Sequence, residues 1–455
     1  MQKKKKKVNL LEGSISKGIL LFVMPIILGT LIQQLYVTTD AVIVGQLTGK
    51  EGLASIDAVS SLFKFPLNFM NGLTAGATIH ISHHFGSGNE KRLKRSVQAA
   101  FIVAAVLGLA CSVAGVCLSR KLLYMMDVPA DIFAETLAYT RIYFGGIWSM
   151  ILYNIAAGIL RAFGDSKSPL YVLIICSLCN IAGDYLLVAV FGFGVGGAAA
   201  ATVVSQIVSL ICTWILLNRA MSGRLQLFRC SVRAEMEDVK TLIATGLPLA
   251  LQAMLYPLAN SIVQVSVNSM GSDTIAAWGV CNKLDMFIWL AADSMGPALT
   301  TYVAQNLGAG KEHRVKKGVL TGTVMSVGVV AVISVVLYLG SGAMGGWFVS
   351  GSDAEMLIPL VIKYMQMMAP YYIFYAVAEA LSGACCGMGN TVIPMAATLL
   401  TICLLRVAGI WLVQPEYESM ECIIWIYIVS WVAAGLTFII MYFLQAEKRF
   451  GDRKE

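Results

Sequence analysis

Stretches of about twenty apolar residues, the length that crosses the hydrocarbon core of a bilayer as a helix, recur along the whole chain between short polar turns. The strict alternation of apolar and polar residues that marks membrane-spanning strands is absent, so helices must satisfy the backbone in lipid. We therefore predict an all-α polytopic membrane protein. Its twelve expected transmembrane helices begin near Lys17, Leu53, Ser96, Ala134, Leu170, Gly196, Lys240, Ile275, Lys316, Ile358, Ile393 and Cys422.

The composition agrees with a surface that faces lipid. Of the 455 residues, 58% are hydrophobic and 13% are charged, and the mean hydropathy is +0.75. Soluble globular domains carry roughly 25% charged residues. The first apolar segment is too long for a cleavable signal peptide, lacks a small-residue cleavage site and is followed by further spans. We expect it to remain as the first helix.

The placement of the basic residues decides how the net charge of +7 is interpreted. They cluster on alternate loops, and the intervening loops are neutral or acidic, except that Arg120 and Lys121 are offset by Asp127 and Asp131. By the positive-inside rule, we expect a multi-pass protein of the plasma membrane with both termini in the cytoplasm, and nucleic acid is not an expected partner. The clusters are Lys3 to Lys7; Lys91, Arg92, Lys94 and Arg95; Arg161 and Lys167; Arg219, Arg224, Arg229 and Arg233; Lys311, Arg314, Lys316 and Lys317; and Lys448, Arg449, Arg453 and Lys454.

The second half of the sequence repeats the first at an offset of 222 to 225 residues. Each half has an even number of expected spans, which makes the repeat parallel; transporters often place a substrate site between such halves. We predict an N-terminal six-helix lobe at 1–220, a cytoplasmic linker at 221–239 and a C-terminal six-helix lobe at 240–455. Matched pairs include Pro25 and Pro248, Gly86 and Gly308, Gly88 and Gly310, Arg92 and Arg314, Gly158 and Gly383, and Pro169 and Pro394.

Motifs for other chemistry are weak. The eleven cysteines lie mostly in apolar spans, where a thiol behaves as a small hydrophobe, and the Cys176–Cys179 pair has no second pair with which to bind zinc. His80, His83 and His84 have a helical spacing suited to a metal, but they fall at the end of a span beside a basic loop. We expect no metal site, no cofactor and no disulfide framework.

The glycine-rich loop at Gly86 and Gly88 lacks the Lys-Ser/Thr continuation of a P-loop. Transport is therefore expected to draw on an ion gradient rather than on ATP hydrolysis. No clustered catalytic motif is apparent, and we predict that the protein is not an enzyme.

Six motifs follow one another along the chain: Pro25 to Asp40, His84 to Glu90, Leu160 to Pro169, Asn180 to Asp184, Phe193 to Ala199, and Ala304 to Gly310. In this order and at these spacings they resemble the multidrug and toxic compound extrusion (MATE) family of transporters, over essentially the whole chain. The resemblance implies twelve helices in two lobes and export of bulky amphipathic, often cationic compounds. It also implies coupling to an inward flow of protons or sodium ions.

One branch of that family keeps a cation site in the N-terminal lobe, and its residue types are matched here by Asp40, Asn180, Asp184 and Thr202. Another branch uses acids of the C-terminal lobe. That branch has an acid soon after the proline of helix seven, but residues 249–264, which follow Pro248 here, contain none. In helix ten that branch usually has an aspartate, and this sequence has Glu379. The resemblance therefore favours the branch with the N-terminal cation site.

Physical reasoning supports the same residues. A carboxylate inside a span is costly and is a functional candidate by default, which applies to Asp40 unless it lies in solvent near the outer interface. Asn180 and Asp184 share a helix face at i, i+4, and Thr202 adds a hydroxyl, so hard oxygen ligands for sodium are available. Alternatively, desolvation and mutual repulsion make Asp40 and Asp184 share a proton. Pro25 permits the first helix to bend as a hinge.

The second half carries Asp285, Asp293 and Glu379 within its expected spans. These acids are candidates for neutralising a cationic substrate, which aromatic and methionine side chains would hold. Glu379 is alternatively an auxiliary proton site, and whether these acids take part in coupling stays open. The aromatic and methionine side chains could instead serve ordinary packing or face lipid. They are Tyr256, Tyr371, Trp289, Tyr372, Met254, Met365 and Met368.

Three other functions are alternatives to drug export. A flippase for lipid-linked saccharides shares this helical layout, but it tends to need a strongly basic central cavity, and the expected spans hold more acids than bases. An intramembrane enzyme would need a catalytic cluster. A channel would not need two mobile halves. The physiological substrate, the choice of proton or sodium, and the oligomeric state stay open, with a monomer as the working expectation.

Overall fold

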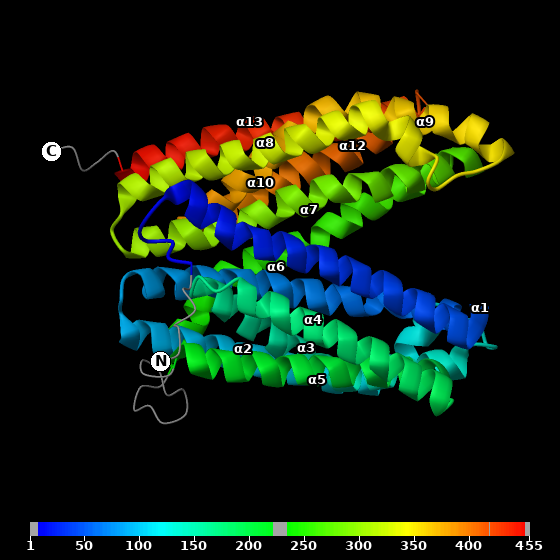
Figure 1. Ribbon diagram of the computed structural model, residues 1–455, viewed down its shortest axis with the longest axis horizontal. Helices are drawn as coiled ribbons and strands as arrows, with labels where there is room; N and C mark the ends of the chain where they lie inside the picture. The colour runs from blue at the N-terminus through cyan, green and yellow to red at the C-terminus, as the bar shows by residue number, and fades with distance from the viewer. Residues whose placement is uncertain (1–7, 222–233, 418, 451–455) are drawn as a thin grey trace. The chain divides into compact units, whose positions relative to one another are not determined.

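The computed structural model describes residues 8–221, 234–417 and 419–450, and helices joined by short turns make up that part of the chain. Most of the expected linker, part of the expected basic clusters and Glu418 lie outside the described residues. Helices of each half run alongside one another as long rods (Figure 1). The first half consists of α1 (Ile15–Gly86), α2 (Glu90–Met125), α3 (Phe133–Ala162), α4 (Lys167–Asp184), the π-helical turn η1 (Tyr185–Val190) and α5 (Gly194–Met221).

The second half has more interruptions. Its helices are α6 (Met236–Asn268), α7 (Ser272–Gly308), α8 (Glu312–Gly345), α9 (Ser352–Met368), the 3₁₀ turn η2 (Ala369–Tyr371), α10 (Tyr372–Gly387), α11 (Val392–Thr398), the π-helical turn η3 (Leu399–Leu404), α12 (Leu405–Leu412) and α13 (Met420–Phe450).

α1 holds two of the expected spans. At Gly49 the backbone leaves the helical region, with φ 72° and ψ −167°, a conformation that glycine adopts at little cost because it has no Cβ. The ribbon of α1 turns back on itself in Figure 1. Each of its two arms contains one proline, Pro25 in the first and Pro66 in the second.

The helices account for all twelve expected spans. Ten helical segments in the described residues are long and apolar enough to cross a membrane, and α1 supplies two spans instead of one. The remaining span is α9 together with α10, which falls outside that group of ten because Pro370 in η2 divides it into two shorter helices.

The chain forms two compact units, which we call the N-terminal and C-terminal lobes. The N-terminal lobe comprises Met24–Ala250 with the residues up to Asn9, and the C-terminal lobe comprises Leu251–Glu455 with Leu10–Val23. The first turns of α1 thus belong to the C-terminal lobe, and the first turns of α6 belong to the N-terminal lobe. In α1 the change from one lobe to the other lies next to Pro25, and in α6 it lies next to Pro248. The sequence repeat matches these two prolines with each other. The lobe limits expected from the sequence stay a prediction.

Small residues let helices of each lobe approach closely. In the N-terminal lobe, Gly72 and Gly76 of α1 lie directly against the α6 backbone at Ala250 and Gly246. Small residues four apart on both partners permit such backbone contact within a membrane.

The repeated glycines Gly158 and Gly383 occupy equivalent places in the two lobes. Gly158 of α3 faces Thr74 of α1, and Gly383 of α10 faces the backbone of Gly296 on α7. Thr74 and Gly296 are themselves 222 residues apart, within the offset of the repeat. Close helix packing therefore accounts for the constant register of these two glycines.

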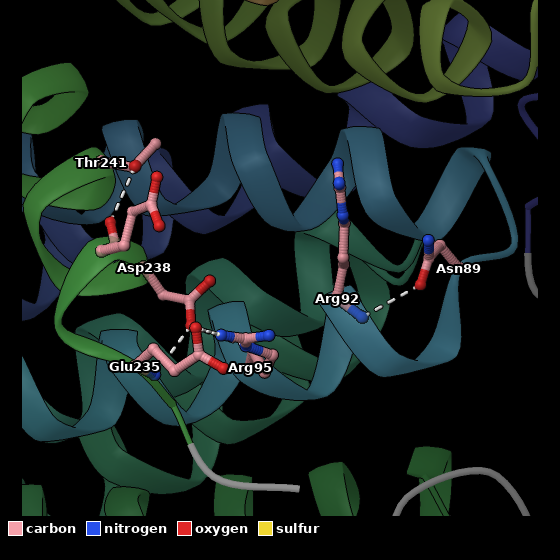
Figure 2. A network of polar contacts seen from close by, with 7 residues as sticks. Asn89, Arg92, Arg95, Glu235, Asp238 and Thr241 are labelled. Carbon is pink, nitrogen blue, oxygen red and sulfur yellow. Dashed lines mark hydrogen bonds and ion pairs between the residues drawn. The ribbon is translucent and has the colours of Figure 1, made fainter.

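The segment that leads into α6 is tied to the N-terminal lobe by charge. Figure 2 shows Arg95 of α2 beside Glu235 and Asp238, and its Nε donates to Asp238 Oδ2 at 2.8 Å. In the same view Asn89 caps α2, where its Oδ1 accepts the Arg92 backbone N–H at 3.1 Å.

The segment that leads into α1 is tied to the C-terminal lobe through its backbone instead. Arg314 donates to the carbonyls of Gly13 at 3.0 Å and Leu10 at 3.2 Å. Asn306 also donates to Leu10, and Lys311 donates to Leu11 at 2.9 Å. The N-terminal lobe therefore holds the segment before α6, and the C-terminal lobe holds the segment before α1. Each of these two helices then continues into the sequence of the other lobe.

Candidate functional site

The four residues expected to bind a cation come together in the N-terminal lobe. Asp40 lies on the first arm of α1, Asn180 and Asp184 lie on α4, and Thr202 lies on α5. Asn180 and Asp184 are fully buried, Thr202 is 8% exposed and Asp40 is half-buried. We call these four residues the carboxylate cluster.

The Asn180 amide lies at the centre of the carboxylate cluster. With its nitrogen towards Thr202, Nδ2 donates to Thr202 Oγ1 at 3.3 Å. In the opposite orientation, Nδ2 donates to Asp40 Oδ1 at 3.2 Å and to Asp184 Oδ2 at 3.1 Å. The second orientation suits the surroundings, because the nitrogen then faces carboxylate acceptors, whereas the first sets the amide oxygen against carboxylate oxygens. The Asn180 amide therefore bridges the two acids by donating to both.

Asp40 and Asp184 also lie within hydrogen-bonding range of each other. A hydrogen bond between two carboxyl groups forms only if a proton lies between them. Asp184 Oδ1 is buried and has no hydrogen-bond partner in the described part of the chain, which leaves it an acceptor to spare. The cluster therefore has the donor set for one proton or for one small cation.

Local backbone structure explains how Asp184 is presented. α4 ends at Asp184, and the chain continues as the π-helical turn η1. Single π-helical turns within helices are frequent at functional sites, since they rotate the side chains that flank them. Gly183 lies against Ala201 of α5, so the two helices that carry Asp184 and Thr202 approach closely at this level.

Three tyrosines beside the carboxylate cluster were missed by the sequence analysis. Tyr36, one turn before Asp40, lies within hydrogen-bonding range of Thr202. Tyr139 and Tyr143 of α3 lie within electrostatic range of Asp40, and Phe63 packs on the Tyr143 ring at 4.0 Å. The signal was available, since Tyr36 precedes Asp40 at the i, i+4 spacing that joins side chains on one helix face.

Pro25 lies apart from the carboxylate cluster. Fifteen residues separate it from Asp40 on the same arm of α1, about 22 Å at the rise of an α-helix. It is buried and stands next to the point where α1 passes from one lobe's sequence to the other's. A bend at Pro25 would therefore act on Asp40 through the helix between them and not by contact.

The C-terminal lobe contains a partly open cavity of about 340 Å³. Of the five residues expected to bind substrate, Asp285, Asp293 and Tyr256 line it. Glu379 is half-buried and lies near Gly296 of α7, and Tyr371 packs against Phe374 and Trp425. The other lining residues are Asn260, Gln264, Trp278, Asn282, Trp289, Tyr364, Tyr375, Arg406 and Tyr427. We call this space the C-lobe cavity.

Tyrosine hydroxyls hold the two acids of the C-lobe cavity. Asp285 is 1% exposed and accepts hydrogen bonds from Tyr364 at 2.7 Å and from Tyr372. Asp293 accepts the Tyr375 hydroxyl at 2.7 Å and is otherwise exposed. Asp285 is thus a satisfied buried group, while Asp293 remains open to a ligand.

Arg406 is the other residue that the sequence analysis missed. It lies on α12 just after the π-helical turn η3 and is 1% exposed. An arginine inside an apolar span is a functional candidate by the same rule that singled out the acids. The sequence-based expectation named the intramembrane acids and did not include Arg406.

Comparison with known proteins identifies the family. The MatE family model matches residues 25–186 and 248–412. The probable multidrug resistance protein YoeA of Bacillus subtilis is 27% identical over 442 residues, covering 95% of this chain and 94% of that protein. The probable multidrug resistance protein NorM of Thermotoga maritima is 22% identical over 443 residues, covering 96% and 94%.

Solved structures share the fold. A MOP superfamily transporter from Pyrococcus furiosus superposes with a TM-score of 0.87 at 19% identity and full coverage of both chains. A structure described as MATE in the bent conformation gives 0.87 at 19% identity, with 99% and 98% covered. The family match includes most of both lobes and confirms the expected all-α fold of twelve spans. The chain belongs to the MatE family of multidrug efflux transporters.

Proposed function

We propose that this transporter exports amphipathic, often cationic drugs or toxic metabolites in exchange for protons or sodium ions. The carrying observation is the carboxylate cluster, in which two acids meet around one amide inside a buried site. Buried carboxylates in a membrane span mark ion pathways because they are too costly to keep without a role. The names of the relatives support drug export.

Coupling follows from charge in the cluster. With neither proton nor cation, Asp40 and Asp184 would place two negative charges in contact within a medium of low dielectric, which is strongly unfavourable. Binding one proton or one sodium ion removes that repulsion. The cluster therefore loads from the side with the higher ion activity and unloads towards the other side when access changes.

The change in access is proposed to be a rocking of the two lobes, with Pro25 as a hinge. Pro25 removes a backbone hydrogen bond and lets the first arm of α1 bend. Asp40 lies on that same arm, so a change in its contacts with Asn180 and Asp184 alters the strain along the helix. The bend then favours one access state over the other.

The proposed substrate site includes the C-lobe cavity, whose aromatic walls suit flat, apolar molecules and whose acids suit a cationic group. Asp293 is the residue we assign to that contact, with Asp285, Tyr256, Glu379 and Tyr371 as further candidates. The protein is proposed to act as a monomer in the plasma membrane. Its loop charges support placing both termini in the cytoplasm.

The test is dye efflux from proteoliposomes under a sodium gradient or a proton gradient, imposed separately. Asp40→Asn and Asp184→Asn, reconstituted to the same amount as the wild type, are expected to abolish gradient-driven efflux. If either gradient drives the wild type and both variants still export at its rate, the proposed coupling site is wrong.

A further inference from the structure

Arg406 carries a positive charge into the wall of the C-lobe cavity. Its partners are neutral: Nε donates to Ser430 Oγ at 2.9 Å and Nη1 donates to Asn260 Oδ1 at 3.0 Å. The guanidinium also lies 4.0 Å from the ring centroid of Tyr427. These contacts orient the group but do not neutralise it.

The guanidinium still has unused donors. Nη2 is buried and has no hydrogen-bond partner among the described residues, and within that part of the chain no carboxylate pairs with Arg406. A buried charge without a counter-ion is costly. Arginine also presents a planar fork that matches a carboxylate with two parallel hydrogen bonds. An anionic oxygen group is the kind of partner that would satisfy both the charge and the unused donors of Arg406.

The same cavity offers the opposite charge elsewhere on its wall. Asp293 is exposed and has one oxygen bonded to Tyr375, while Asp285 is fully occupied by two tyrosines. Tyr256 lies within electrostatic range of both Arg406 and Asp293. A ligand in this cavity thus meets a positive group and a negative group that do not cancel each other directly.

We infer that the C-lobe cavity binds amphipathic zwitterions, with a carboxylate on Arg406 and a protonated amine on Asp293. The aromatic rings of Trp278, Trp289 and Tyr364 line the same cavity and suit the apolar body of such a molecule. This inference rests on the proposed role of the cavity as a substrate site and names the substrate class that it prefers.

The test uses two fluorescent dyes that differ in one group. Rhodamine 110 carries a free carboxylate and a cationic ring system, and rhodamine 123 is its methyl ester. Binding of each dye to the purified full-length protein is measured by fluorescence anisotropy. Wild type is expected to bind rhodamine 110 about tenfold more tightly, the effect of one charge-assisted contact.

Variants locate the carboxylate contact. Arg406→Gln is expected to weaken rhodamine 110 about tenfold and to leave rhodamine 123 nearly unchanged. Asp293→Asn should weaken both dyes. Lys363→Gln is the matched control: it removes a positive charge from the same lobe, at a lysine that pairs with Glu421 outside the cavity lining, and should change neither dye.

If Arg406→Gln does not fold, competition binding to the wild-type protein tests the carboxylate contact instead. Benzoate should displace rhodamine 110, and benzyl alcohol, which lacks the carboxylate, should not. Equal affinity for the two dyes together with no competition by benzoate would overturn the inference. So would an equal loss of both dyes in a folded Arg406→Gln protein.

Export is measured separately, as gradient-driven efflux of rhodamine 123 from proteoliposomes. Efflux without any preference for the carboxylate dye would overturn the zwitterion site and leave the transport proposal standing. A preference for the carboxylate dye in binding without efflux would overturn the transport proposal and leave the zwitterion site standing.

Discussion

The carboxylate cluster of the N-terminal lobe and the C-lobe cavity differ in both charge and size. The cluster brings together two acids, an amide and a hydroxyl, and the described residues contain no basic partner for either acid. The cavity has room for an organic molecule, and its two acids share the wall with Arg406. Oxygen ligands in close contact suit an ion, whereas a wide aromatic space with both signs of charge suits a substrate.

This difference has developed on a shared framework. Gly158 and Gly383 make equivalent helix contacts in the two lobes, and both lobes carry a π-helical turn in the corresponding span. However, Leu405 and Gly409 stand where the repeat would place partners of Asn180 and Asp184, and Arg406 is adjacent. A duplicated scaffold thus keeps its packing residues while its polar residues take on different tasks.

The largest expected effect is at Asp184. Asp184→Asn removes one of the two charges that a coupling ion neutralises, so gradient-driven efflux should fall about 100-fold, equivalent to about 2.7 kcal/mol. Asp285→Asn, which also removes a buried acid, should leave the ion dependence unchanged. Initial efflux rates at matched protein amounts check both. Loss of ion dependence in Asp285→Asn alone would reverse the roles of the two lobes.

A large structural effect is expected at Gly383. A methyl group there meets the backbone of Gly296, which cannot rotate away, whereas a methyl group at Gly158 meets the side chains of Thr74 at 2.7 Å and Thr78 at 3.1 Å. Gly383→Ala should cost about 2 to 3 kcal/mol and Gly158→Ala about 1 kcal/mol. Thermal unfolding in detergent gives the order. Equal Tm values for the two variants would show that the lobes tolerate overpacking alike.

A moderate effect is expected at Asp293. Asp293→Asn should raise the dye concentration for half-maximal efflux about tenfold, because it removes an exposed charge that contacts cationic cargo, worth about 1.4 kcal/mol. The maximal rate and the response to the ion gradient should stay near the wild-type values. The opposite pattern would contradict this prediction: a lower maximal rate with an unchanged dye concentration for half-maximal efflux.

The smallest effects are expected at the ties that hold the first segments of α1 and α6. Arg314→Ala removes donors to two backbone carbonyls and should lower Tm by a few degrees, with little dependence on salt. Arg95→Ala removes contacts to Glu235 and Asp238 and should lower Tm less, because exposed ion pairs contribute little and are screened by salt. Unfolding at low and high salt separates the two, and a larger, salt-independent loss in Arg95→Ala would contradict this ranking.

Properties that depend on local pattern were predictable from the sequence. The spans follow from hydropathy, the repeat from glycines and prolines held in place by packing, and half of the carboxylate cluster from the i, i+4 spacing of Asn180 and Asp184. Properties that depend on contacts between distant helices were not predictable. Tertiary packing brings Tyr139 and Tyr143 close to Asp40. It also decides which substrate candidates line the C-lobe cavity and which lie outside its lining. Arg406 was visible as an intramembrane charge, but its neutral partners come from α6 and α13.

The central claim is that the ion and the substrate are handled by different lobes, and the number of ions moved inward per dye exported tests it most directly. The driving ion and rhodamine 123 are followed together in proteoliposomes for wild type, Asp184→Asn and Asp293→Asn. The account predicts that Asp184→Asn loses both fluxes, whereas Asp293→Asn needs more dye but keeps the wild-type ratio of ions to dye. A changed ratio in Asp293→Asn, or an unchanged one in an active Asp184→Asn protein, would contradict it.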